Sequence, residues 1–199
     1  ASARQSNPNA QPSERAAADL TKLQVFVETK NWASALDLLN GILSYAAPNS
    51  YDRALANDII SKIDMQKGDY TEAIKPLEQA LQLGDANKFF DEKSQLDRVN
   101  YLAQLFYQEA STSKVKSVQE QYFTKANYYM AMWFKRTTKP TEEARLLYAT
   151  LLYSQAVLDP NKPDHALLDQ AMQQVHEGLL GSLHPKENFY VLLLASLQQ

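Results

Sequence analysis

Two amphipathic helices joined by one tight turn are predicted between Ala54 and Asn87, and this pairing constrains the fold more than any other part of the chain. The turn is Lys67-Gly68-Asp69-Tyr70, and apolar residues recur at helical spacing on both sides of it. Small and large residues alternate where the helices would touch. The small ones are Ser61, Ala73 and Ala80, and the large ones are Ile60, Tyr70 and Leu77.

This hairpin resembles a tetratricopeptide repeat, in which a small residue sits where paired helices meet and large apolar residues lie beside it. The glycine, aromatic and alanine fall at the offsets typical of that family. Asn57 and Asp64 stand where the family usually has aromatic residues, and Asp85 replaces its closing proline. The resemblance implies an array of stacked hairpins.

Further hairpins are predicted on both sides of this one. Trp32 and Ala35 repeat Tyr70 and Ala73 at the same step of 38 residues. Helical patterns with intervening turns cover about residues 13–49 before this hairpin. After it they cover about residues 99–140, 147–179 and 186–197. The expected fold is all-α, a right-handed α-α superhelix of about four hairpins plus a C-terminal helix, in one domain over residues 13–199.

The composition agrees with an all-α fold and excludes several classes of function. Only 5 of 199 residues are glycine, and no alternating strand pattern is present. The absence of cysteine removes disulfides, thiolate nucleophiles and zinc–sulfur sites. A net charge of −3 gives no overall attraction to nucleic acid, and no apolar run is long enough to span a bilayer.

The first twelve residues are polar and contain Pro8 and Pro12, so they are expected to form a disordered leader over residues 1–12. The sequence begins Ala1-Ser2-Ala3-Arg4, without methionine. Such a start is expected of an exported protein whose signal peptide has been removed, and it predicts a periplasmic location.

No catalytic, cofactor or metal site is predicted. His176-Glu177 begins a His-Glu-x-x-His metal motif, but Leu180 occupies the position of the second ligand. No glycine-rich phosphate loop and no Gly-x-Ser-x-Gly nucleophile turn are present. The chain is therefore expected to be a non-enzymatic protein without a cofactor.

A basic segment lies between Ser113 and Pro140, where six cations accompany the single acid Glu120. Aromatic residues interleave with these cations, a combination that superficially suggests nucleic-acid stacking. Their helical spacing favours core packing instead. A solvated face is the preferred interpretation, with a docking patch for an acidic protein as the second.

The concave surface of a tetratricopeptide array is formed mainly by first-helix positions beside the small packing residue. Aligned with that family, the candidate protein-binding residues are Asp58, Lys62 and Met65 in the second hairpin, Asn100, Gln104 and Tyr107 in the third, and Thr150 and Tyr153 in the fourth. Amides can bind a peptide backbone while tyrosine rings cover its side chains. The expected partner is a protein or extended peptide, although plain solvent exposure competes for any single residue.

Three short motifs are similar to those of periplasmic tetratricopeptide proteins that accompany bacterial TonB energy-transduction systems. They lie at residues 126–134, 140–149 and 186–190, and the similarity covers roughly the residues after Tyr51. The resemblance implies a scaffold in the envelope of a Gram-negative bacterium. An assembly or pilotin-type factor for outer-membrane or pilus machinery, and an accessory domain of a larger enzyme, remain alternatives.

The C-terminal helix is expected to be apolar nearly all round, with Phe189, Val191, Leu193 and Leu197 among its large residues. Several uncovered apolar side chains would favour association. A homodimer through this helix is therefore expected, with folding back onto the chain, burial by a partner and coverage by further sequence as alternatives.

Overall fold

The computed structural model describes residues 7–180 and 191–195, and throughout these ranges the regular structure is helical, without a strand. The chain divides into two compact units, Ala1–Leu102 and Ala103–Gln199. Each unit is described by itself.

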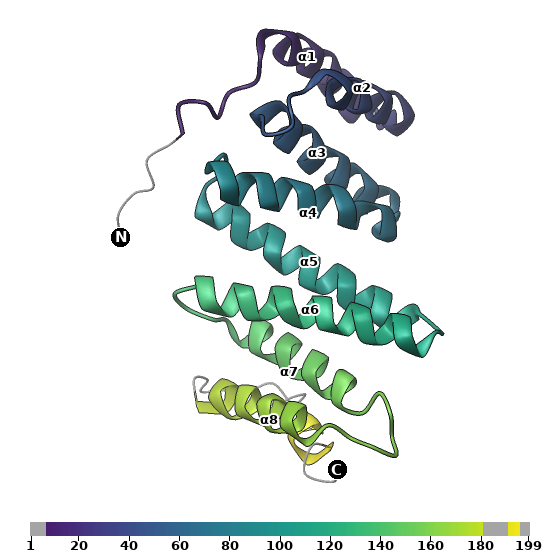
Figure 1. Ribbon diagram of the computed structural model, residues 1–199, viewed down its shortest axis with the longest axis vertical. Coiled ribbons are helices and arrows are strands. Elements are labelled where there is room, and N and C mark those ends of the chain that lie inside the picture. Colours follow the sequence, from purple (N-terminus) through teal and green to yellow (C-terminus); the bar gives the residue numbers. More distant parts are fainter. Residues whose placement is uncertain (1–6, 181–190, 196–199) are drawn as a thin grey trace. The chain divides into compact units, whose positions relative to one another are not determined.

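The first unit contains the helices that the repeat pattern predicted. They are α1 (Glu14–Glu28), α2 (Trp32–Tyr45), α3 (Tyr51–Lys67), α4 (Tyr70–Asn87) and the start of α5 (Glu92–Thr112). Helix α1 packs on α2, α2 on α3, and α3 on α4, so neighbours in sequence are neighbours in space (Figure 1). This sequential pairing is what stacked helical hairpins require.

The helix ends of the first unit are set by local sequence. Ser13, Asn31 and Ser50 precede α1, α2 and α3, and each side chain accepts a hydrogen bond from a backbone N–H in the first turn. Gly68 ends α3 with a φ of 81°, a left-handed conformation that glycine adopts without strain. The predicted turn between α3 and α4 thus follows from its glycine.

Small residues lie where the helices of the first unit touch, as the repeat pattern predicted. Ala35, Ser61, Ala73 and Ala80 are each 0% exposed. Tyr70 differs from the prediction, because it is 40% exposed and lies at the surface instead of beside the alanines. As the first residue of α4, it lies directly after the turn that joins α3 to α4.

The second unit continues the pattern with the rest of α5, α6 (Lys116–Arg136), α7 (Glu142–Ala156) and α8 (His165–Leu180). Helix α6 packs on α7, and α7 on α8. Ala126, Ala149 and Ala171 are each 0% exposed and take the role that Ala73 has in the first unit.

Aromatic residues of the basic segment pack largely into the second unit. Phe123 and Tyr129 are 4% and 3% exposed, and the ring of Tyr129 stacks on Phe106 with centroids 5.8 Å apart. Tyr128 is the exception at 56% exposed. The interpretation of these aromatics as packing residues agrees with this arrangement.

The C-terminal helix lies mostly outside the described residues. Its described part, residues 191–195, is helical. Leu192 and Leu193 pack against the cluster formed by Ala149 and Val175, whereas Val191 and Leu194 are 59% and 61% exposed. Part of the predicted apolar surface therefore folds back onto α7 and α8, and dimerisation stays a prediction.

Half of the predicted leader, residues 1–6, also lies outside the described part of the chain. The other half contacts the first unit. The Asn7 amide donates to the carbonyl oxygen of Asn87, and Ala10 packs against Ala54, Leu83 and Phe89. The prediction of a disordered leader did not include these contacts.

The all-α, helical-hairpin architecture is confirmed, and the right-handed sense of a superhelix stays a prediction. Among the described helices, none combines the length and the apolar character needed to cross a membrane.

Replacing the buried Ala73 of α4 by leucine is expected to destabilise the fold by about 1–3 kcal/mol, because overpacking forces the paired helices apart. The matched control is Ala86→Leu, at an exposed position of the same helix. Ala126→Leu and the exposed Ala131→Leu make the same comparison on α6.

Chemical denaturation measures the free energy of unfolding of all four variants. The exposed substitutions should stay within about 0.5 kcal/mol of the parent. Equal stabilities for buried and exposed substitutions would show that the repeat register is wrong.

Candidate functional site

A hollow of about 190 Å³ opens in the first unit between side chains of α3, α4 and α5. We call it the α3–α5 groove. It is lined by Asp58, Ser61, Lys62 and Met65 of α3, Leu77 of α4, and Ser94, Asp97, Arg98 and Tyr101 of α5.

Helical periodicity explains why these residues share one hollow. The α3 positions are 58, 61, 62 and 65, and the α5 positions are 94, 97, 98 and 101. Both sets follow the i, i+3, i+4, i+7 spacing that brings side chains onto one helix face. Each helix therefore presents a single stripe to the groove.

A buried ion pair between Asp58 and Arg98 forms the floor of the groove. The Arg98 Nε donates to Asp58 Oδ1 at 2.9 Å, and the two residues are only 7% and 3% exposed. Lys62 Nζ lies 2.9 Å from the other oxygen, Asp58 Oδ2. Since a buried charge is costly unless it is paired, both carboxylate oxygens need these partners.

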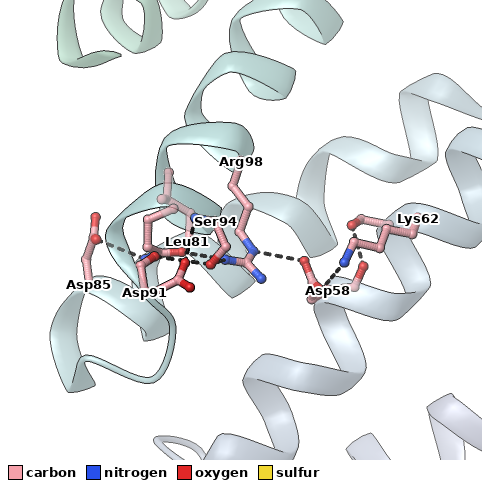
Figure 2. Close-up of polar contacts among 9 residues, drawn as sticks. Asp58, Lys62, Leu81, Asp85, Asp91, Ser94 and Arg98 are labelled. Atoms are coloured by element: carbon pink, nitrogen blue, oxygen red, sulfur yellow. Dashed lines mark hydrogen bonds and ion pairs between the residues drawn. The ribbon is translucent and has the colours of Figure 1, made fainter. Parts of the chain in front are cut away.

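The Arg98 guanidinium is also held from its own helix. Figure 2 shows Arg98 between Asp58 on one side and Ser94 on the other. Its Nη1 donates to Ser94 Oγ at 3.0 Å and to Gln95 Oε1 at 2.9 Å. The guanidinium carbon lies 3.8 Å from the centre of the Phe90 ring, a cation–π contact.

Gln95 connects this network to α4. It is 0% exposed, and its Nε2 donates to the Leu81 carbonyl oxygen at 3.1 Å and to Asp85 Oδ1 at 2.9 Å. Every polar end of the Gln95 amide therefore has a partner. The chain of contacts from Asp58 through Arg98 and Gln95 ties α3, α5 and α4 together.

The start of α5 is fixed by Asp91. Its Oδ1 accepts from the Ser94 backbone N–H at 2.8 Å. This hydrogen bond, followed by one from the Ser94 side chain, lowers the pKa of the Asp91 carboxyl below its ordinary value. Ser94 thus links the first turn of α5 to the Arg98 network.

The rim of the groove is exposed and carries both signs of charge. The Lys62 side chain is 63% exposed, Asp97 is exposed, and Tyr101 is 50% exposed. Met65 is half-buried and adds a flexible apolar surface. Such a rim can contact both polar and apolar groups of a ligand.

The structure brings together three of the eight residues predicted to bind protein. Asp58, Lys62 and Met65 lie in the α3–α5 groove. Asn100 is half-buried on α5, but its neighbour Tyr101 lines the groove in its place.

The remaining four predicted residues belong to the second unit. Gln104 is exposed, and Tyr107 lies against Phe123 with ring centroids 6.2 Å apart. Thr150 donates to the Leu146 carbonyl oxygen at 2.8 Å, and Tyr153 is half-buried. A shared binding face for these residues stays a prediction.

Sequence reasoning missed the α5 half of the groove, which is formed by Ser94, Asp97, Arg98 and Tyr101. One signal was available. Arg98 directly precedes the apolar residues Val99, Leu102 and Ala103, so a cation is placed at the edge of a buried helix face. A carboxylate from another helix would offset the cost of burying such a cation.

The described residues contain no group of histidine, aspartate and glutamate side chains placed to hold a metal ion. Comparison of the chain with protein-family models and with curated proteins finds no match.

Gly84→Ala is expected to destabilise the first unit by about 1–3 kcal/mol through overpacking. A Cβ at Gly84 would lie 2.5 Å from Gln95 Nε2 and 2.8 Å from a Phe90 ring carbon. Neither side chain is free to move, because Gln95 is buried and hydrogen-bonded and Phe90 packs on Arg98.

Gly41→Ala is the matched control, since a Cβ there would meet nothing within 4 Å. This helical substitution should stabilise the protein by about 0.5–1 kcal/mol. Thermal and chemical denaturation measure both effects, and a Gly84→Ala variant as stable as Gly41→Ala would contradict the packing of α5 on α4.

Proposed function

We propose that the chain is a non-enzymatic, tetratricopeptide-type scaffold for protein–protein interaction, and that the α3–α5 groove binds an anchor side chain of an extended partner segment. One observation carries the proposal. Asp58, Lys62 and Met65, predicted from sequence to face a partner, line one hollow together with Arg98 and Tyr101.

The size of the groove supports a protein partner over a small metabolite. Its volume of about 190 Å³ lies below the range of about 300–1,000 Å³ that is typical of small-molecule sites. One side chain fits this space. The rest of the segment would lie over the exposed rim, an arrangement in which a few buried anchors supply most of the binding energy.

The polar groups of the groove suit a peptide backbone. The described contacts of Arg98 use Nε and Nη1, which leaves the two N–H groups of Nη2 for a carbonyl or carboxylate oxygen of the partner. Lys62 and Asp97 on the rim offer one charge of each sign. Tyr101 adds a half-exposed ring that can cover an apolar side chain.

We further propose that this scaffold works in the bacterial periplasm, within a TonB-linked energy-transduction complex. The support is the similarity of residues 126–134 and 140–149 to periplasmic tetratricopeptide proteins of such systems.

The test is a pull-down from envelope extracts of a Gram-negative bacterium that has a TonB system, with recovered proteins quantified by mass spectrometry. The groove variant is Lys62→Glu combined with Tyr101→Ala. The matched control is Lys135→Glu combined with Tyr128→Ala, which changes an exposed lysine and an exposed tyrosine of the second unit. Circular dichroism confirms equal helix content.

The parent should recover a component of the TonB system, and the groove variant should recover at least about tenfold less, equivalent to about 1.4 kcal/mol of binding free energy. The control should match the parent. Loss with the control variant alone would move the site to the basic segment, and undiminished recovery with both would contradict a site at either place. Recovery of partners outside any TonB system would contradict the TonB link.

A further inference from the structure

A second hollow, of about 310 Å³, lies elsewhere in the first unit, where the segment before α1 crosses the start of α3 and the end of α4. We call it the leader cavity. Its walls come from residues 7–13, from residues 49–52, and from Asn87 and Phe89. The cavity shares no lining residue with the α3–α5 groove, so the inference drawn from it is independent of the proposed function.

The wall formed by residues 7–13 is attached at several points. Asn7 donates to the carbonyl oxygen of Asn87, and Ala10 packs on the cluster that includes Phe89. At the other end, the Ser13 backbone N–H donates to Asp52 Oδ1 at 2.8 Å. These contacts hold the segment against the first unit, where it forms one wall of the cavity.

The lining of the leader cavity is polar and carries no cation. Five side-chain amides line it, from Asn7, Asn9, Gln11, Asn49 and Asn87. An anion such as phosphate would find no positive charge there. An amide side chain both donates and accepts hydrogen bonds, as a hydroxyl group does. The described contacts engage the amides of Asn7 and Asn87, so Asn9, Gln11 and Asn49 are the amides that offer both functions to a ligand.

Asp52 supplies the one charge of the lining. The residue is only 8% exposed, and of its two carboxylate oxygens the described contacts use Oδ1. Oδ2 is left to accept from a ligand, and a hydrogen bond from a ligand hydroxyl to a carboxylate is stronger than one to a neutral acceptor.

Two aromatic rings complete the lining. Tyr51 and Phe89 lie edge to face, with centroids 5.7 Å apart, and both line the cavity. An aromatic ring can cover the C–H face of a ligand while the amides bind its hydroxyl groups, and the Tyr51 ring also carries a hydroxyl group. The volume falls at the small end of the range typical of small-molecule sites, which suits a ligand of one ring.

We propose that the leader cavity binds a neutral saccharide unit, with Asp52 Oδ2 and the lining amides holding its hydroxyl groups and Tyr51 covering its C–H face. The unit is either a free monosaccharide or one residue of a longer glycan. Both sources present the same chemistry to this cavity.

The test uses the full chain labelled with ¹⁵N, titrated with glucose, N-acetylglucosamine, the trisaccharides maltotriose and chitotriose, and inorganic phosphate. Backbone amide shifts report where each probe binds. At least one saccharide is expected to give saturable shifts around residues 49–52 and Asn87, and phosphate none. A response to a monosaccharide identifies the free sugar as sufficient, whereas a response to a trisaccharide alone identifies a glycan chain.

The variant is Gln11→Ala combined with Asn49→Ala, two exposed lining positions that carry little risk to folding. It should raise the Kd about tenfold or more. Asn161→Ala, an exposed amide of the second unit, should leave the Kd unchanged. The proposal is overturned if no saccharide binds up to about 10 mM, well above a weak Kd of about 1 mM, if the shifts lie elsewhere, or if the double variant binds like the parent.

Discussion

The buried ion pair between Asp58 and Arg98 is the contact on which the first unit and its groove depend. The two residues are 40 positions apart in sequence, and their side chains meet at 2.9 Å where α3 faces α5. Because the pair is buried, removing one partner leaves an uncompensated charge and lowers the free energy of unfolding by about 3–5 kcal/mol. Arg98 also donates to Ser94 and Gln95 and packs on the Phe90 ring, so several contacts hold the guanidinium beside Asp58.

Small residues at the helix interfaces let the helices approach closely enough for this ion pair to form. Ser61 and Ala73 are fully buried, and Gly84 leaves room for Gln95 beside it. Gln95 in turn reaches the Leu81 carbonyl oxygen of α4. The groove is therefore a consequence of how closely three helices approach one another, and a larger side chain at any of these interfaces would alter its floor.

Much of the fold follows from sequence because its causes are local. The turn at Gly68 and the alanine spacing each act within a few residues, so a single sequence reveals them. Three α3 residues of the groove, Asp58, Lys62 and Met65, were predicted from the alignment with tetratricopeptide repeats. The α5 half of the groove was not predicted, because it depends on which carboxylate Arg98 contacts 40 residues away. The exposure of Tyr70 was not predicted either, because it depends on the position of this residue beside the turn of the hairpin. Asp52 and Asp58 lie on the same helix, and the sequence does not reveal the partner of either. Asp52 accepts a hydrogen bond from the Ser13 backbone N–H before α1, whereas Asp58 accepts one from Arg98 of α5.

A double-mutant cycle on Asp58 and Arg98 tests the account most directly. Asp58→Ala, Arg98→Ala and the double variant are compared with the parent by chemical denaturation, with Lys62 present in all four proteins. A coupling free energy of about 0.5–3 kcal/mol, with the double variant less destabilised than the sum of the single variants, is the predicted result. Additive effects, with a coupling indistinguishable from zero, would show that the two side chains do not hold α3 and α5 together.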